Sequence, residues 1–330
     1  MRCTDNLGVT YTLRLVPDAL LMAAPSVGYV ELPWPVMRID VHGHYLPAEY
    51  VALLGKDDPA VRLQGRIDER VGMLDEAGVE LQVLSHGSNV PYFDREADAV
   101  AAAQVGNDLY AQIARDYPGR LRAFGSVPLP HVDAAIAEAN RCLDKLDMLG
   151  ITLGCSVGER TLDERAFEPL WAELDRRNAV VFLHPIFRTG DAHLREYELA
   201  RMVGACFEDT VAALRLLLSG VTGRHPNLRI IVPHFGGTLP VLYPRIARRG
   251  KADLLRQLYY DTANGYGPAL RCACETLGTE RLMLGTDFPY IGSIKDNVDY
   301  VLRAGLSEEQ QARILEQTAV ELLGLAAPAT

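Results

Sequence analysis

Two histidines separated by one residue form the strongest chemical signal in this chain of 330 residues. They are His42 and His44, in the segment Asp40-Val41-His42-Gly43-His44. Because side chains alternate between the two faces of a strand, both imidazoles would point to the same side. Two neutral imidazoles side by side suit one divalent cation, whereas a pair of solvated loop histidines is the alternative.

Three more polar residues occupy similar positions, each after an apolar run and shortly before a glycine or proline turn. One histidine after a strand is usually a satisfied structural group. The repetition of this placement, together with His42 and His44, indicates a shared site where several strand ends meet. The three segments are Leu183-His184-Pro185, Pro233-His234-Phe235-Gly236-Gly237 and Gly285-Thr286-Asp287-Phe288-Pro289.

The elements that would position these residues begin at residue 37, where short apolar runs start to alternate with longer amphipathic segments. The runs are nearly continuous in hydrophobic residues, which is typical of buried parallel strands. The predicted strands are Met37–Val41, Leu81–Leu84, Leu121–Phe124, Gly150–Leu153, Val180–Leu183, Ile230–Val232, Gln257–Tyr260 and Arg281–Leu284. The predicted helices are Ile67–Ala77, Glu96–Tyr117, Val132–Leu146, Glu164–Arg177, Thr210–Leu218, Leu239–Arg249, Pro268–Leu277 and Ser307–Leu323.

Eight strands that alternate with helices over about 290 residues predict an α/β fold, a (β/α)₈ TIM barrel of the metal-dependent hydrolase type. A doubly wound sheet is the alternative, but no G-x-G-x-x-G motif follows the first predicted strand. In a barrel the carboxyl ends of the strands meet at one mouth, where active sites lie. Closure of the barrel would therefore bring together His42, His44, His184, His234 and Asp287.

Residues 1–36 differ from the rest of the chain, because they show no clear period and contain Pro17, Pro25, Pro33 and Pro35. We expect an N-terminal extension with poor order, which is either an appended arm or a mis-assigned start. Residues 37–330 are expected to form a single barrel domain.

The composition excludes several classes of function. A net charge of -10 without a basic run argues against nucleic acid, and no apolar run of ~18 residues could span a membrane. The 6 cysteines are scattered, and Cys272-x-Cys274 lacks the second pair that a zinc site would need. We therefore expect reduced thiols and a cytoplasmic protein. An anionic substrate would need local arginines, since the overall field repels it.

The order of the motifs resembles the amidohydrolase superfamily, over about Met37 to Leu325. Within it, the chain is similar to the aminocarboxymuconate-semialdehyde decarboxylase branch, which includes the γ-resorcylate and other aromatic acid decarboxylases. The resemblance implies that His42, His44, His184 and Asp287 bind one metal, and that His234 is the catalytic acid and base beside Asp287.

Substrate contacts are expected at five further positions. The resemblance implies that Arg70 holds a substrate carboxylate, and that Arg245 reaches the neighbouring site across a homodimer interface. His86, after the second predicted strand, faces the same mouth or is an ordinary loop histidine. Phe187 and Phe288 would form an apolar wall that excludes water.

The lysines of the chain indicate how many metals the site holds. A binuclear hydrolase needs a carboxylated lysine at the end of the fourth strand, where this chain has Gly154-Cys155-Ser156. One divalent metal is therefore expected, with Zn²⁺ favoured by the donor set and Mn²⁺ as the alternative.

The expected reaction is metal-dependent, non-oxidative decarboxylation of a small aromatic or muconate-like carboxylic acid. The same site could instead hydrolyse a lactone or an amide, or hydrate an unsaturated acid. A barrel that binds metal without catalysis is the third hypothesis, and the presence of His234 beside a complete ligand set argues against it.

Overall fold

The computed structural model describes residues 2–4, 10–12, 37–55, 60–187 and 192–325. The chain forms two compact units, residues 1–33 and 34–330. In the first unit, β1 (Arg2–Thr4) pairs with β2 (Thr10–Thr12) in an antiparallel manner. Residues 13–36 lie outside the described residues, so the poor order expected for the extension and its boundary at residue 36 remain predictions.

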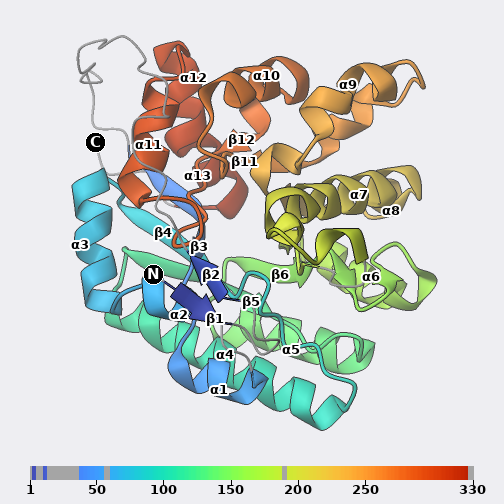
Figure 1. Cartoon of the computed structure of the whole chain (residues 1–330). Coiled ribbons are helices and arrows are strands. Elements are labelled where there is room, and N and C mark those ends of the chain that lie inside the picture. The colour runs from blue at the N-terminus through green and yellow to red at the C-terminus, as the bar shows by residue number, and fades with distance from the viewer. Residues whose placement is uncertain (1, 5–9, 13–36, 56–59, 188–191, 326–330) are drawn as a thin grey trace. The chain divides into compact units, whose positions relative to one another are not determined.

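The second unit is built on eight parallel strands within residues 37–325, and the strands follow one another in chain order around the sheet (Figure 1). This arrangement confirms the predicted (β/α)₈ barrel. The registers pair Ile39 with Leu81 at the first interface and Gly154 with His184 at a central one. The strands are β3 (Ile39–His44), β4 (Leu81–Ser85), β5 (Leu121–Ser126), β6 (Gly150–Gly154), β9 (Val180–His184), β10 (Arg229–Val232), β11 (Tyr259–Asp261) and β12 (Leu282–Met283).

Hydrogen bonds between the first strand and the segment after the last strand close the barrel. The Val41 amide donates to the Leu284 carbonyl at 2.9 Å, and the Asp287 amide donates to the His42 carbonyl at 2.7 Å. The His44 amide completes the seam through the Phe288 carbonyl at 2.9 Å. A doubly wound sheet would leave these two edges apart, so that alternative is wrong.

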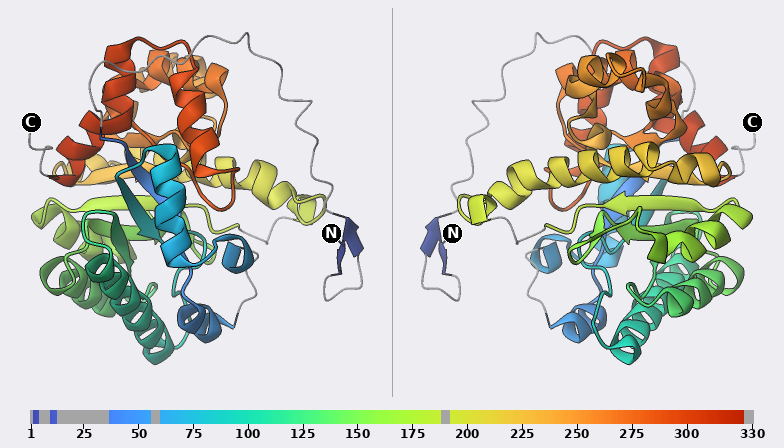
Figure 2. Two further views of the ribbon diagram at one scale, coloured as in Figure 1. Left: turned by 90° about the vertical axis from the view of Figure 1, so that its left-hand side faces the viewer. Right: turned by 90° about the vertical axis from the view of Figure 1, so that its right-hand side faces the viewer.

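Helices surround the strands on all sides in Figure 1, and the side views show α4 and α5 on one side and α10 to α13 on the other (Figure 2). Two short β-strands, β7 (Ser156–Val157) and β8 (Arg160–Thr161), form a hairpin after β6. The helices are α1 (Ala48–Leu54), α2 (Ala60–Leu63), α3 (Ile67–Ala77), α4 (Glu96–Asp116), α5 (Val132–Lys145), α6 (Glu168–Arg176), α7 (Ala205–Leu218), α8 (Val221–Arg224), α9 (Leu239–Ala247), α10 (Gly267–Leu277), α11 (Ile294–Leu302), α12 (Glu308–Ala312) and α13 (Thr318–Leu323).

Several helices differ from the predicted ones, and the short helices α1, α2 and α8 were not predicted. The helix expected from Thr210 begins at Ala205 and follows a π-helical segment, η4 (Ala200–Gly204). Helix α11 was not predicted, and the expected last helix is divided by the π-helical η8 (Arg313–Gln317) into α12 and α13. Ser307 caps α12 in a capping box with Gln310, as its sequence indicates.

The largest apolar cluster lies among the strands and is joined by side chains of α13. Phe124 and Phe182 stack within it, with ring centroids 5.4 Å apart. The Phe182 ring also contacts the His42 ring at 4.9 Å, so the top of the core meets the predicted site. The buried members are Ile39, Val41, Leu81, Val83, Phe124, Val180, Phe182, Ile231, Met283, Ala319, Leu322 and Leu323.

Two further expectations concern membrane-spanning helices and the state of the cysteines. None of the helices among them is both long enough and apolar enough to cross a membrane. The cysteines described there, including Cys272 and Cys274, are free thiols.

A buried polar network supports the seam of the barrel. Arg70, on α3, donates from Nη1 to Gln82 Oε1 at 2.8 Å and from Nη2 to the His44 carbonyl at 2.9 Å. Gln82 Nε2 donates to Asp40 Oδ2, and the same oxygen accepts from the Thr286 hydroxyl, both at 2.6 Å. Burial lowers the pKa of Arg70 to about 10, against the opposing charge of Asp40. Arg70 therefore neutralises a buried carboxylate that joins the first strand to the last.

We predict that Arg70→Met lowers the free energy of unfolding by about 3 kcal/mol, because it leaves the Asp40 carboxylate buried without a cation. Urea denaturation followed by circular dichroism measures the difference. Arg66→Met is the matched control, since Arg66 lies four residues earlier and is exposed. Equal stability of Arg70→Met and the unmodified protein would contradict the structural role.

Candidate metal centre

Four side chains from distant parts of the chain converge at the mouth of the barrel. His42 and His44 come from β3, His184 from the end of β9, and Asp287 from the loop after β12. All four are buried, and one potential ligand atom from each lies within 4.8 Å of the others. His44 Nε2 is 3.0 Å from His42 Nε2 and 2.8 Å from Asp287 Oδ1. The group could hold a single metal ion.

The second nitrogen of each histidine has a hydrogen-bond acceptor. His42 Nδ1 lies 2.7 Å from Asp261 Oδ2, His44 Nδ1 lies 3.1 Å from the Ser85 carbonyl, and His184 Nδ1 lies 2.8 Å from the Pro185 carbonyl. Donation from Nδ1 leaves the lone pair on Nε2, which is the tautomer that a metal requires.

The hydrogen bonding of one atom of the site fits a bound group. His184 Nε2 is buried and has no hydrogen-bond partner among the described residues. An unpartnered buried nitrogen is costly, and it is rare unless a ligand or water satisfies it. Because this nitrogen belongs to the same group as Nε2 of His42 and His44, the donor set fits one divalent cation.

The charges within the group are strongly coupled. Burial lowers the pKa of His42, but the charges of Asp261 and Asp287 outweigh this effect and raise it to about 9. Burial keeps the pKa of His44 and of His184 below the ordinary value. Burial would raise the pKa of Asp287, yet the His42 charge and hydrogen bonds hold it well below its usual range. These shifts favour an ionised carboxylate at Asp287 and neutral imidazoles at His44 and His184, while the two carboxylates beside His42 favour a positive charge there.

His234 lies beside the group, with Nε2 3.4 Å from Asp287 Oδ2. Its Nδ1 is 2.8 Å from Oδ2 of Asp209, a wholly buried residue of α7. Its backbone amide donates to Asp261 Oδ1 at 2.9 Å. Burial lowers the pKa of His234, but the Asp209 charge and the hydrogen bonds raise it well above the ordinary value. His234 is therefore held by the carboxylates of Asp209 and Asp261, and its Nε2 atom is directed at the candidate ligands.

The backbone of the site is strained. His234, Phe235 and Asp287 have positive φ angles of 54°, 59° and 52°, which non-glycine residues rarely adopt. Gly87 also has a positive φ of 57°, and a Cβ atom there would lie 2.7 Å from His44 Cε1. Only glycine fits at this position without displacing a predicted ligand. Such clustered strain is typical of functional sites.

Two predicted substrate contacts, His86 and Arg70, are buried among protein groups. The His86 ring stacks between Tyr50 and Tyr110, with centroids 4.0 and 4.3 Å away, and its Nδ1 contacts Ser126 Oγ at 2.7 Å. Burial lowers the pKa of His86 to about 3, so it is a neutral group between β4 and its covering helices. Arg70 is wholly buried, and both of its Nη atoms already donate to protein acceptors. Their roles as substrate contacts stay predictions.

The three remaining contacts differ in position. The Phe288 ring lies under the Arg70 guanidinium, 4.4 Å from its Cζ atom, and is largely buried. Phe187 is half-buried at the mouth, three residues after His184. Arg245 is exposed on α9. Its predicted reach across a dimer interface is not tested by a single chain.

Sequence reasoning missed Asp209 and the residues at the outer rim, Arg201 and Tyr290. The expected helix began at Thr210 and so excluded the carboxylate just before it. A buried acidic residue in an apolar helix is the signal that could have identified Asp209. Arg201 lies in the π-helical segment η4 and Tyr290 in the loop after β12, and no local sequence pattern relates them.

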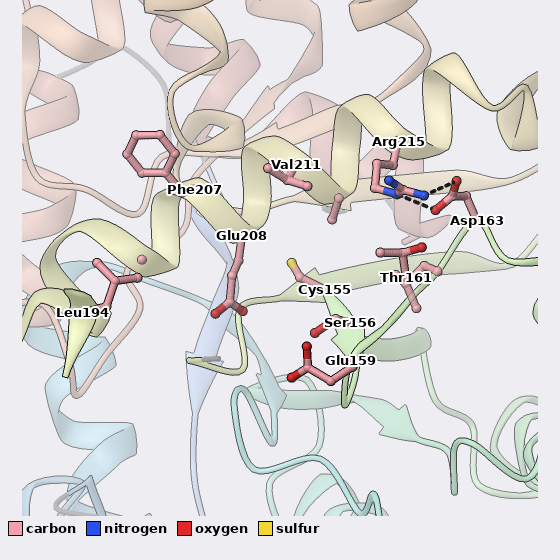
Figure 3. A pocket seen from close by; sticks show the side chains of 13 residues that line it. Cys155, Ser156, Glu159, Thr161, Asp163, Leu194, Phe207, Glu208, Val211 and Arg215 are labelled. Atoms are coloured by element: carbon pink, nitrogen blue, oxygen red, sulfur yellow. Dashed lines mark hydrogen bonds and ion pairs between the residues drawn. The ribbon is translucent and has the colours of Figure 1, made fainter. Parts of the chain in front are cut away.

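A separate cavity of about 600 Å³ is lined by residues of the β7–β8 hairpin and of α7. In Figure 3, Glu208 from α7 and Glu159 from the β7–β8 hairpin point into the same space. Cys155 lines this cavity, and its thiol donates to Asp209 Oδ1 at 3.4 Å. None of the predicted ligands lines it, so this cavity is distinct from the metal centre.

Comparisons with known proteins agree with this architecture. The 2-amino-3-carboxymuconate-6-semialdehyde decarboxylase of Dictyostelium discoideum is 29% identical over 78% of this chain and 76% of its own length. The 6-methylsalicylic acid decarboxylase acuB of Aspergillus aculeatus is 30% identical over 87% of this chain and 93% of its own length. A solved dihydroxybenzoic acid decarboxylase from Polaromonas, with bound manganese and 2-nitroresorcinol, is 25% identical and covers 88% of this chain and 97% of that one, with a TM-score of 0.77.

The comparison with family models covers almost the whole barrel. The amidohydrolase model matches residues 39–325, from the first barrel strand to the end of α13. The match includes all four residues of the metal centre and His234. The chain therefore belongs to the amidohydrolase family.

Proposed function

We propose that the protein is a metal-dependent decarboxylase, which releases CO₂ from a small aromatic or muconate-like carboxylic acid without an oxidant. The observation that carries this proposal is the buried group of three imidazoles and one carboxylate, with His234 directly beside it. The similar proteins named above are decarboxylases of such acids. Hydrolysis and hydration have no comparable support.

The residues that would hold the cation are His42, His44, His184 and Asp287. Imidazole nitrogens with one carboxylate oxygen favour Zn²⁺, and Mn²⁺ is the metal of the solved Polaromonas enzyme. When bound, a divalent cation supplies positive charge that orients the carboxylate and neighbouring oxygen of a substrate. Asp261 supports this arrangement by fixing the tautomer of His42.

Direct loss of CO₂ from an aromatic ring would leave a carbanion of very high energy. In the proposed reaction His234 Nε2 first delivers a proton to the ring carbon that bears the carboxylate. The bond between that carbon and the carboxylate then breaks, its electron pair restores the aromatic ring, and CO₂ leaves. The net reaction consumes one proton, and a proton from water returns His234 to its starting state.

Asp209 positions the acid. Its carboxylate accepts from His234 Nδ1, so the transferable proton is on Nε2, the atom nearest Asp287. The negative charge of Asp209 also stabilises the imidazolium form of His234. The Cys155 thiol and the His234 imidazole contact different oxygens of Asp209 and hold its orientation.

The homodimer is part of the proposal. Arg245 is exposed on α9, and Val241, four residues earlier and thus on the same face of that helix, has a side chain that is 77% exposed. Arg245 forms no ion pair within the described residues, whereas surface arginines such as Arg141, Arg215 and Arg224 do. An apolar side chain next to an unpaired arginine is typical of an interface.

Removal of one ligand tests the metal site. We expect His184→Ala to weaken metal binding by more than about 100-fold, because loss of an outer partner alone costs about 10- to 100-fold. Metal content after dialysis and the shift of the thermal midpoint on chelation are the measurements. The control is His193→Ala, which changes an exposed histidine. Retention of a full equivalent of metal by His184→Ala would contradict the assigned ligand set.

Turnover tests the proposed reaction. The metal-loaded protein is incubated with a panel of hydroxybenzoates, a lactone and an amide, and CO₂ release is measured. We expect CO₂ from at least one acid, and a loss of about 10²- to 10⁴-fold in kcat for His234→Ala with unchanged metal content. If the acids remain intact while the lactone or the amide is cleaved, the decarboxylase assignment is wrong.

The positioning role of Asp209 has a distinct kinetic signature. Asp209→Asn should lower kcat by about 10-fold, less than loss of the acid itself, because His234 remains but loses its charged partner. KM and metal content should stay near those of the unmodified enzyme. A fall in metal content, or an equal fall in unfolding temperature and activity, would indicate a merely structural role. Asp209→Glu serves as the charge-conserving comparison.

A further inference from the structure

Arg201 is held between two aromatic rings at the outer rim of the metal centre. Its Cζ atom lies 4.7 Å from the centre of the Phe187 ring and 5.2 Å from that of Tyr290. Phe187 is three residues after His184, and Tyr290 is three residues after Asp287. Arg201 is therefore connected to two of the loops that supply the ligands.

Tyr290 connects Arg201 to the candidate metal ligands. The Tyr290 ring meets the His44 ring edge-on, with centroids 5.4 Å apart. The Arg201 guanidinium is thus separated from a ligand by one aromatic ring. Phe187 has a positive φ of 53°, and Arg201 belongs to the π-helical segment η4, so both are placed by unusual backbone conformations. Such conformations are frequent at functional sites.

The charge of Arg201 has no counterpart in the described part of the chain. No carboxylate there forms an ion pair with it, although Arg141, Arg215 and Arg224 on the surface each have one. Contact with ring faces leaves the N–H donors at the edge of the guanidinium available, and a carboxylate can accept from two of them at once. In a chain of net charge -10, an unpaired arginine at this rim provides local attraction for an anion.

The two other arginines considered for this task are less suitable within one chain. Both Nη atoms of Arg70 are engaged in the barrel seam. Arg245 lies exposed on α9 and contacts none of the ligand loops through a described interaction. Arg201 is the cation that lies next to both Phe187 and Tyr290.

We propose that Arg201 binds a second anionic group of the substrate, at the ring position meta to the carboxylate that leaves. The inference rests on the proposed decarboxylase function and narrows it to substrates that carry two negative charges, such as a benzene dicarboxylate. Phe187 and Tyr290 would flank the substrate ring between the metal ligands and Arg201.

Equilibrium binding tests this assignment without requiring turnover. Isothermal titration calorimetry compares isophthalate with benzoate on the metal-loaded protein. In Arg201→Met we expect isophthalate to bind about 10- to 100-fold more weakly, the size of a charge-assisted hydrogen bond, while benzoate binding changes little. Arg201→Lys should restore part of the difference. Arg195→Met, at an exposed arginine of the same surface, is the matched control and should change neither ligand.

Turnover of 4-hydroxyisophthalate and salicylate completes the test. Arg201→Met should raise KM for the dicarboxylate and leave kcat and the salicylate reaction nearly unchanged. An unchanged preference for isophthalate in Arg201→Met, or no binding of isophthalate by the unmodified protein, overturns the assignment. If isophthalate binding depends on Arg201 but no acid releases CO₂, the anion site stands and the decarboxylase proposal fails.

Discussion

The repulsion between histidine nitrogen lone pairs at the mouth of the barrel is the main physical constraint on this structure. Nε2 atoms of His42 and His44 are 3.0 Å apart, and their Nδ1 atoms face fixed acceptors. Two lone pairs at this distance repel each other strongly in a buried site, and a proton or a metal cation between them turns the repulsion into attraction. A proton on His42 would relieve that pair but leave His184 Nε2 without a partner. A divalent ion satisfies all of these nitrogens at once.

The residues that close the barrel also supply most of the candidate metal ligands. The hydrogen bonds that close the barrel involve the backbones of His42, His44 and Asp287, which are also three of the four candidate ligands. Residues 243 positions apart in the chain are thus brought into contact by strand pairing rather than by flexible loops. The positive φ angles of His234 and Asp287 are compatible with such a rigid frame, because the surrounding hydrogen bonds over-determine them.

The ligands could be predicted from sequence because each of them follows an apolar strand, and parallel strands in a barrel end at one mouth. Burial could not be predicted in the same way. From the sequence, Arg70 is either a solvated helix arginine or a residue that binds a carboxylate. Its buried contact with Gln82, which in turn donates to Asp40, is visible only in the fold. Asp209 was missed because the predicted helix starts at Thr210, whereas α7 begins five residues earlier. Arg201 depends on two loops that meet only in the folded chain.

The loop after β12 relates the two arginines that flank the site. Phe288 and Tyr290 follow Asp287 closely, and their rings contact different arginines, Arg70 toward the interior and Arg201 at the rim. Both contacts are between a guanidinium and an aromatic ring, yet their surroundings are opposite, because Arg70 is paired and wholly buried while Arg201 is exposed. The inner arginine balances a charge of the protein itself. The outer one has no carboxylate partner among the described residues, so its charge is available to an anionic group of a substrate bound near Asp287, three residues before Tyr290.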